Sequence, residues 1–347
     1  MLAAVYHGPN DLRVEDVPVP RIGEGELLVK VHSASICGTD LRILHGNHRM
    51  YPSGTVRIPG HEVVGSIAEA GADQKAHPAG QRVFCAPNTG CGHCLQCITG
   101  NNNLCANYDA IGVTSDGGFA EYVRIPAKSV QQGNIIPIGD AVDPAVAALT
   151  EPFACVVRGQ NALRMQPGEV VLVIGAGPIG IMHAKLAKAR GAGQVIVSEM
   201  IPDRADQARR LGIGRVVDPA AEDLKQVLWQ ESNSRGADII IVAAPAHAAQ
   251  ESALELAAIS GRINFFGGLP KDRPTVTIDS NLIHYKELVI TATTACSTAD
   301  CWQASQIIAS GLVDLSDIVS QRFALKDAVA AFAAAEDRKS LKVVLQP

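Results

Sequence analysis

The chain has 347 residues, which exceeds what a single hydrophobic core organises and predicts two domains. Hydrophobic residues make up 47% and charged residues 19% of the sequence, which excludes an intrinsically disordered chain. With 30 basic and 35 acidic residues, the net charge of −5 argues against a nucleic-acid partner.

The N-terminal residues contain neither a basic leader nor a long apolar segment, so we expect no secretory signal. The longest apolar stretch, 170–184, is interrupted by Gly175, Gly177, Pro178 and Gly180 and predicts no membrane span. Nine cysteines without such a signal are typical of a reducing compartment, where clustered cysteines more often bind metals than form disulfides. We therefore expect a cytoplasmic protein.

Short strands and many glycine and proline turns predict a β-rich domain over the first ~145 residues. Expected strands there include 26–31, 62–68 and 119–125. Near Asp143 the pattern changes to an alanine-rich helical stretch, 144–149, which precedes Glu151 and Pro152.

From Glu169 onward, strands alternate with helical patterns such as 179–190 and 202–211. This alternation predicts an α/β domain with βαβ units and a doubly wound parallel sheet. The tail from about residue 294 has two helical stretches and a final strand, 342–345, that can pair back into the first domain. The expected strands of the sheet are 170–174, 194–198, 215–218, 238–243, 262–266 and 288–293.

A glycine-rich turn, Gly175 to Gly180, follows the first of these strands and opens a helix. Gly175 permits the tight turn, Gly177 lets the backbone approach a pyrophosphate, and Gly180 lets the helix pack against the strand. Pro178 and Ile179 begin the helix, whose unpaired N–H groups and positive dipole attract phosphates. The turn therefore predicts a dinucleotide site.

Glu199 ends the next strand, nineteen residues after Gly180. Its carboxylate can accept hydrogen bonds from both adenine-ribose hydroxyls and repels a 2′-phosphate, which predicts NAD rather than NADP. Arg204 leaves NADP open, because a nearby arginine can bind that phosphate.

Four cysteines, Cys91, Cys94, Cys97 and Cys105, follow one another at short spacings. Four thiolates at this spacing can close a tetrahedron around zinc, and such closed sites are structural. Four cysteines also suit an iron–sulfur cluster, but the segment resembles a known zinc lobe.

A second set of metal-binding residue types is spread along the chain. It comprises Cys37 before Gly-Thr-Asp40, His61 and Glu62 in one motif, and Glu151 before Pro152. Spacing alone does not establish that these residues converge.

Taken in order, the motifs resemble those of zinc-containing medium-chain dehydrogenases, and the similarity covers essentially the whole chain. The pair Glu151-Pro152 looks like the polyol (sorbitol) and threonine dehydrogenase branch, since classical alcohol dehydrogenases carry cysteine at that position. The resemblance implies a β-rich GroES-like catalytic domain, 1–148 with 293–347, and a Rossmann domain, 149–292, that binds NAD. It also implies two zinc ions per subunit and a homotetramer or homodimer, with the edge strand 288–293 as a place for subunits to pair.

The resemblance further implies that Cys37, His61 and one or both of Glu62 and Glu151 hold the catalytic zinc. The remaining glutamate would bind a water on the metal, and the sequence leaves the choice open. Zinc would lower the pKa of a substrate hydroxyl, and the nicotinamide would accept the hydride. Thr39 resembles the proton-relay hydroxyl of the family.

Many relatives continue the relay with a histidine five residues after the ligand cysteine, where this chain has Arg42. A guanidinium has no acceptor, so the proton must leave by another route, through His45 or a water near Glu151. Arg42, His45, His48 and Arg49 either favour an anionic substrate or form a solvated basic loop.

Three further cysteines, Cys155, Cys296 and Cys301, are interpreted as packing residues or surface thiols because they lack ligand spacing. The main hypothesis is a zinc- and NAD-dependent dehydrogenase acting on a secondary hydroxyl of a polyol, sugar alcohol or sugar derivative. The alternatives are an L-threonine or amino-alcohol dehydrogenase, and a catalytically silent zinc- and dinucleotide-binding protein.

Overall fold

The structure, a computed structural model, describes residues 1–72, 74–337 and 339–347. The chain forms two compact units. The first comprises Met1–Ala154 and Ala295–Pro347, and the second comprises Cys155–Thr294. Among the described residues, no helix has both the length and the apolar character needed to cross a bilayer.

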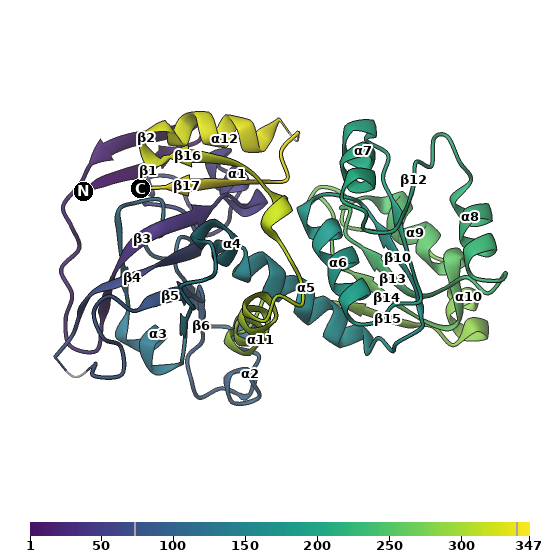
Figure 1. The fold of residues 1–347 in the computed structure, drawn as a ribbon, viewed down its shortest axis with the longest axis horizontal. Coiled ribbons are helices and arrows are strands. Elements are labelled where there is room, and N and C mark those ends of the chain that lie inside the picture. Colours follow the sequence, from purple (N-terminus) through teal and green to yellow (C-terminus); the bar gives the residue numbers. More distant parts are fainter. Residues whose placement is uncertain (73, 338) are drawn as a thin grey trace. The chain divides into compact units, whose positions relative to one another are not determined.

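The first unit is built around a mixed sheet of seven strands in the order β16-β17-β3-β4-β5-β9, with β8 also paired to β3 (Figure 1). Two small antiparallel pairs, β1 with β2 and β6 with β7, complete its strands. The strands are β1 (Leu2–Gly8), β2 (Asp11–Asp16), β3 (Leu27–Ser35), β4 (Glu62–Ala70), β5 (Arg82–Cys85), β6 (Asn88–Thr89), β7 (Asp109–Ala110), β8 (Tyr122–Ile125), β9 (Ile135–Pro137), β16 (Val319–Ala324) and β17 (Lys342–Gln346).

Helices of the first unit are short. They are α1 (Gly38–Leu44), α2 (Leu95–Ile98), α3 (Ala127–Gln131), α4 (Pro144–Ala148), α11 (Thr298–Ala309) and α12 (Ala328–Glu336), with 3-10 turns η1 (Asn102–Leu104), η2 (Ser316–Ile318) and η3 (Leu325–Asp327). A longer helix, α5 (Thr150–Leu163), begins in this unit and continues into the second.

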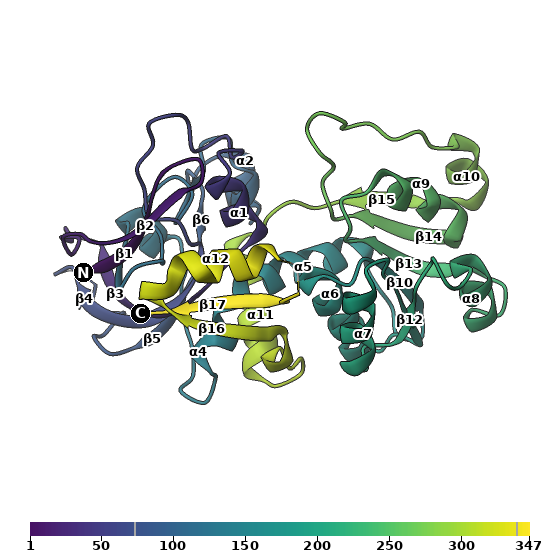
Figure 2. The ribbon, with the colours of Figure 1, turned by 90° about the horizontal axis from the view of Figure 1, so that it is seen from above.

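The core of the first unit lies where β3, β4 and β5 present β-branched side chains that fit a pleated, buried surface. Val29, Val63 and Val83 are fully buried in it. Helix α12 lies along β16 and β17 in both views (Figures 1 and 2), and its Phe332 packs edge-to-face against Phe119. Strand β17 pairs antiparallel with β3, so the tail pairs back into the first unit as the sequence predicts.

The second unit is a six-stranded, all-parallel sheet in the order β12-β11-β10-β13-β14-β15. Because the chain starts in the middle and winds out in both directions, the predicted doubly wound sheet is confirmed. The strands are β10 (Val170–Ile174), β11 (Gln194–Ser198), β12 (Arg215–Val217), β13 (Ala237–Val242), β14 (Ala257–Phe265) and β15 (Val289–Ala292).

Helices cover both faces of this sheet. Figure 1 shows α6 and α7 on one face, and α8, α9 and α10 on the other. Strand β10 is buried along its whole length, which explains its unbroken run of Val, Leu and Ile. The helices are α6 (Pro178–Ala189), α7 (Pro202–Arg210), α8 (Leu224–Glu231), α9 (His247–Leu256) and α10 (Ser280–Lys286).

Candidate functional site

Four cysteine sulfurs gather in the segment between β6 and β7. The Sγ atoms of Cys91, Cys94, Cys97 and Cys105 all lie within 4.8 Å of one another. The separations are 3.5 Å for Cys94–Cys97, 3.8 Å for Cys94–Cys105 and 3.9 Å for Cys91–Cys97. A tetrahedral zinc ion with bonds of about 2.3 Å spaces its sulfurs about 3.8 Å apart. The four-cysteine lobe, residues 91–105, therefore fits zinc without rearrangement.

Backbone N–H groups point at these sulfurs. The N–H of Cys94 donates to Cys91 Sγ and the N–H of Cys91 donates to Cys105 Sγ, both at 3.3 Å. Hydrogen bonds from the backbone of His93 and Cys94 lower the pKa of the Cys91 thiol to about 6. Such bonds stabilise thiolates, which are the form that binds a metal.

A second cluster comes from two different segments. Cys37 is the residue before α1, His61 precedes β4, and Glu62 is the first residue of β4. One donor atom from each of the three lies within 4.8 Å of the others. His61 and Glu62 are buried and Cys37 is half-buried. A thiolate, an imidazole and a carboxylate at this spacing are a ligand set that zinc accepts.

Asp40 stands behind His61, a feature that the sequence analysis missed. Its Oδ1 lies 3.4 Å from His61 Nδ1, its Oδ2 accepts the backbone N–H of Cys37 at 2.8 Å, and its side chain is fully buried. Burial lowers the pKa of His61, but the charges of Asp40 and Cys37 outweigh it and hold that pKa well above its ordinary value. With Nδ1 turned to Asp40, Nε2 is the ring nitrogen left for a metal.

Lys342 stands behind Glu62 and was also missed. From β17 its Nζ donates to Glu62 Oε1 at 2.7 Å, to Oε2 at 2.5 Å and to the carbonyl of Ile36 at 3.0 Å. Burial raises the pKa of Glu62 to about 7, an effect that Lys342 opposes and Glu151 reinforces. Lys342 thus joins both segments that carry the clustered ligands.

Glu151 lies in the first turn of α5 and is buried. It is near enough to raise the pKa of Glu62, although the set of donor atoms within 4.8 Å comprises Cys37, His61 and Glu62 without it. The thiol of Cys296 donates to Glu151 Oε1 at 3.6 Å. Cys296 is fully buried, as expected of a core thiol. The view that it and Cys155 lack ligand spacing was wrong, because one donor atom from each lies within 4.8 Å of Glu151.

Thr39 lies in the first turn of α1, where Arg42 Nη2 donates to its Oγ1 at 2.9 Å. His45, one suggested exit for the proton, contacts other side chains. Its ring nitrogens lie 2.8 Å from Asn10 Oδ1 and 2.7 Å from Glu336 Oε1. Of the basic stretch after Cys37, Arg42 is the member that contacts Thr39.

The glycine turn of the second unit joins β10 to α6. Gly175 has a φ of +106°, which an L side chain rarely adopts, and its N–H donates to the carbonyl of Ser198. At Gly180, a Cβ would overlap the carbonyl oxygen of Gly175. Gly177 is the residue before α6, and Pro178 and Ile179 start the helix, so its N–H groups face outward at the turn. This cradle fits a pyrophosphate.

Glu199 lies directly after β11 and is buried. Its Oε2 accepts the N–H of Ala176 at 2.7 Å and its Oε1 accepts the N–H of Ile201 at 2.9 Å. The carboxylate is thus fixed beside the glycine turn. Arg204 lies on the same side, with Nη1 3.9 Å from the position that a Cβ at Gly177 would take.

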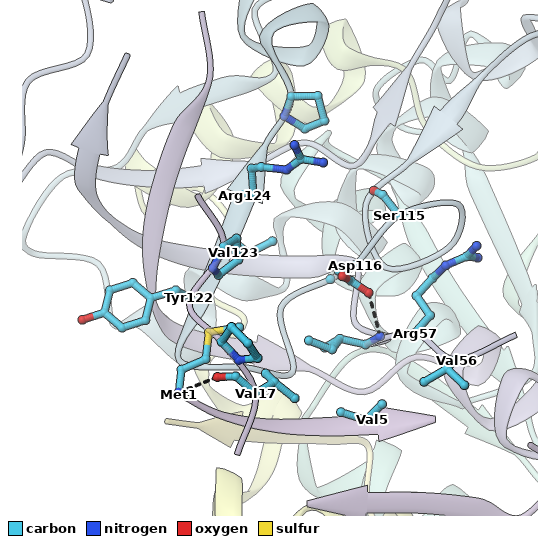
Figure 3. Close-up of a pocket in the computed structure, with 15 residues that line it drawn as sticks. Met1, Val5, Val17, Val56, Arg57, Ser115, Asp116, Tyr122, Val123 and Arg124 are labelled. Carbon is cyan, nitrogen blue, oxygen red and sulfur yellow. Dashed lines mark hydrogen bonds between the residues drawn. The ribbon is translucent and has the colours of Figure 1, made fainter. Parts of the chain in front are cut away.

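A cavity of about 350 Å³ also lies in the first unit, and none of the predicted site residues lines it (Figure 3). Asp116 faces it but already accepts the N–H of Ile58, and the terminal amine of Met1 donates to the carbonyl of Val17. The walls combine apolar side chains such as Val5 and Val123 with the polar side chains of Arg57, Asp116 and Arg124.

Two family models match this chain. Residues 23–137 match the alcohol dehydrogenase GroES-like domain, and residues 178–310 match the zinc-binding dehydrogenase model. The predicted GroES-like and Rossmann-like pair of domains is thereby confirmed.

A curated relative, named L-threonine 3-dehydrogenase, comes from Rhizobium etli (strain CIAT 652). It is 34% identical over 337 residues, which cover 96% of this chain and 94% of the relative. A solved structure of a putative zinc-binding dehydrogenase from Sinorhizobium meliloti 1021, bound to NADP, is 31% identical, with a TM-score of 0.89 and coverage of 100% and 99%. A short chain alcohol dehydrogenase from E. coli CFT073, in complex with NADH, is 28% identical, with the same TM-score and coverage.

Proposed function

We propose that this chain, which belongs to the zinc-containing medium-chain dehydrogenase family, oxidises the secondary hydroxyl of a hydroxy amino acid, L-threonine first of all, with NAD as the acceptor. The observation that carries the reaction type is the buried cluster of Cys37, His61 and Glu62, with Asp40 and Lys342 behind it. The polyol substrate that the sequence favoured has less support than the amino-alcohol alternative, because whole-length relatives carry the threonine dehydrogenase name.

For the metal sites, we propose Cys91, Cys94, Cys97 and Cys105 as the structural set. Cys37, His61 and a glutamate form the catalytic set. Lys342 donates to both oxygens of Glu62, which favours Glu151 as the ligating carboxylate. Zinc bound there would supply the Lewis acidity that lowers the pKa of a substrate hydroxyl, and a bound nicotinamide would accept the hydride.

The residues around this cluster have separate tasks. Asp40 fixes the ring of His61, and Lys342 compensates the charge of Glu62. Thr39 accepts an N–H from Arg42 with one lone pair, which leaves its second lone pair and its own proton for a relay from the substrate hydroxyl.

Arg42 suits an amino acid better than a neutral polyol. Its guanidinium is exposed, and the contact with Thr39 uses one of its several N–H groups. The others can hold a carboxylate in a charge-assisted, bidentate hydrogen bond. A carboxylate bound there would bring the adjoining hydroxyl of a hydroxy amino acid close to Thr39.

The direct test is NADH formation by purified, zinc-loaded protein with L-threonine, sugar alcohols, sugar acids and simple alcohols. The expected result is chelator-sensitive oxidation of L-threonine at a kcat/KM well above that of the other compounds. Activity confined to polyols or sugar acids would return the substrate to the first hypothesis. Demonstrated binding of zinc and NAD without turnover of any compound would support the silent-binder alternative.

The coenzyme preference is proposed to rest on Glu199, with Gly175, Gly177, Pro178, Ile179 and Gly180 forming the pyrophosphate cradle. In Glu199→Ala, kcat/KM with NAD should fall about 10–100-fold, the effect of losing charge-assisted hydrogen bonds to the ribose. The kcat/KM with NADP should stay the same or rise, because Arg204 remains to bind the 2′-phosphate. Arg204→Ala is the matched control and should leave NAD kinetics unchanged. A Glu199→Ala protein with wild-type discrimination would contradict this assignment.

For the assembly, we propose pairing of subunits along β15, the edge strand of the second sheet, in a homodimer or homotetramer. Val289 on this strand is 51% exposed in the single chain, which supports the proposal. Sedimentation measurements give the subunit count.

A further inference from the structure

A hydrogen-bonded network links the four-cysteine lobe to the segment before α11. Asn102 lies within the lobe, between Cys97 and Cys105, and is buried. Its Oδ1 accepts the backbone N–H of Thr298 at 3.0 Å, and its Nδ2 donates to Thr298 Oγ1 at 3.1 Å. Its Nδ2 also donates to the carbonyl of Asn88 on β6 at 2.6 Å. One amide of the lobe therefore holds both β6 and the start of α11.

Asn88 and Asn134 continue the network toward Cys296. Asn88 Nδ2 donates to the carbonyl of Cys296 at 2.9 Å. Asn134, fully buried, donates to the carbonyl of Asn88 at 2.8 Å, and its Oδ1 accepts from Thr298 Oγ1 at 3.0 Å. Three buried asparagine side chains thus hold residues 296–298, two through the backbone and one through the Thr298 hydroxyl. We call them the amide clamp: Asn88, Asn102 and Asn134.

The next residues are equally fixed. Ser297 forms a capping box with Asp300 at the start of α11, in which Ser297 Oγ accepts the N–H of Asp300 and Asp300 Oδ2 accepts the N–H of Ser297. Cys301 contacts Cys296, with the two sulfurs 3.5 Å apart and both residues essentially fully buried. The thiol of Cys296 has little freedom to turn.

That thiol meets the buried carboxylate of Glu151, at 3.6 Å. A buried carboxylate is costly unless hydrogen-bond donors stabilise it, and its orientation follows those donors. An S–H is a weak donor, but here it is held at one place by the amide clamp and by Cys301. The network therefore runs from the lobe through Asn102, Asn88 and Cys296 to Glu151.

We propose that Cys296 is a positioning residue for Glu151, and that the four-cysteine lobe sets its place through the amide clamp. The inference rests on the proposed catalytic set at Cys37, His61 and Glu151. It gives the lobe a role in the active site beyond closing a loop. Loosening the lobe or the clamp lets Cys296 withdraw, and Glu151 then loses one of the contacts that orient it.

The test compares Cys296→Ala, Cys296→Ser and Asn102→Ala with wild type, using kcat and the visible absorption of the cobalt-substituted protein. Cobalt in the lobe gives the spectrum of a four-thiolate site. Subtracting that spectrum from the total leaves the absorption of cobalt at Cys37 and His61, which reports the ligand geometry there. We expect Cys296→Ala to lower kcat about three- to tenfold, as for loss of a weak hydrogen bond, and to shift the cobalt band. Cys296→Ser keeps a donor and should recover most of both signals.

The role of the amide clamp is tested by a double-mutant cycle. Asn102→Ala should change kcat and the cobalt band in the same direction as Cys296→Ala, and should add nothing in the Cys296→Ala background. Should Asn102→Ala not fold, Asn102→Ser serves, because it shortens the contact while keeping a polar group. Cys85→Ala is the matched control, since Cys85 is a buried thiol in β5 outside the amide clamp.

The outcomes distinguish the proposed catalytic set from the positioning role of Cys296. Cobalt bound only at the lobe of the wild-type protein would overturn the proposed catalytic set and this inference with it. Two occupied sites with Cys296→Ala indistinguishable from Cys85→Ala in kcat and spectrum would overturn the positioning role alone. Additive effects of Asn102→Ala and Cys296→Ala would overturn the link to the lobe.

Discussion

In the proposed mechanism, Arg42 binds the substrate and the neighbouring Thr39 transfers the proton. Thr39 has the only hydroxyl in α1, and Arg42 donates to it from the next turn of the helix at 2.9 Å. Since a guanidinium stays protonated, Arg42 can orient Thr39 and attract an anion but cannot take up a proton. The two residues should therefore affect different kinetic constants.

Thr39→Val should lower kcat by about 10²–10⁴, the usual contribution of a positioned proton-transfer group, with a smaller effect on KM. Arg42→Ala should instead raise the KM for L-threonine about 10–100-fold, the effect of losing a charge-assisted hydrogen bond. Steady-state kinetics on both variants measure the split. Arg49→Ala, an exposed arginine in the same stretch, is the control. Full turnover in Thr39→Val would exclude the relay.

Individual site residues differ in how well the sequence could predict them. Cys37, His61 and Glu62 stand in short motifs, and the resemblance of those motifs to a dehydrogenase family grouped the three residues where spacing alone did not. Asp40 belongs to the same motif as Cys37, but sequence alone does not reveal that its side chain turns inward to His61. Lys342 lies 280 residues after Glu62, and only the pairing of β17 with β3 brings them together. Such contacts depend on strand register, which no local pattern specifies.

At the scale of single elements, α6 carries a buried histidine that the proposed chemistry does not use. His183 is fully buried, packs edge-to-face on Phe266 and receives a hydrogen bond from Gln160 at its backbone carbonyl. Burial lowers the pKa of His183 to about 3, so the folded protein keeps the imidazole neutral. The unfolded chain has an ordinary imidazole, whose pKa is 6.5.

This difference predicts the acid sensitivity of the fold. Below the unfolded pKa of 6.5 the unfolded chain binds a proton that the folded chain rejects, so stability falls as the pH drops from 6.5 toward 3. The slope from this group is about 1.4 kcal/mol per pH unit. His183→Leu removes it, so the variant should gain stability relative to wild type in that range. Urea unfolding at pH 7.5, 5.5 and 4.5 measures the difference, and parallel losses in both proteins would contradict the assignment.

The parallel strands were predictable from the sequence because their apolar runs are uninterrupted. The residues at which these strands begin and end were harder to predict. Strand β14 begins at Ala257, five residues before the expected start. Ser260 has a φ of +57° and Gly261 follows it, so the strand kinks and its apolar pattern breaks. In sequence, the first residues of β14 therefore resemble the end of the preceding helix. In the first unit, β8 starts at Tyr122 rather than Phe119, because Phe119 and Ala120 bond to β1 instead.

At the scale of the whole molecule, the four-cysteine lobe has little core of its own. Leu95 and Ile98 are 68% and 70% exposed, so apolar burial contributes little to holding the segment, and the proposed zinc would stabilise it. Cys94→Ser, which breaks the set, should make residues 91–105 the first site of proteolysis. It should also lower the Tm by several degrees.

The second unit should still bind NADH in that variant, because its glycine turn lies outside the lobe. Limited proteolysis with mass spectrometry and NADH fluorescence measure the two effects. Cys85→Ala is again the control. Equal cleavage rates in Cys94→Ser and wild type would mean that metal does not stabilise the lobe.

The pairing of β17 with β3 has a consequence for the order in which the protein is made. A ribosome completes the entire second unit before it synthesises Lys342, the cation that compensates Glu62 at the start of β4. Until β17 emerges, burying that carboxylate costs a large desolvation free energy. The segment carrying His61 and Glu62 is therefore not fixed in its folded position. The growing chain would therefore acquire the proposed nucleotide site first and the proposed metal site last. A chain that loses β17 during synthesis or by proteolysis should still bind coenzyme but should not assemble the proposed metal site.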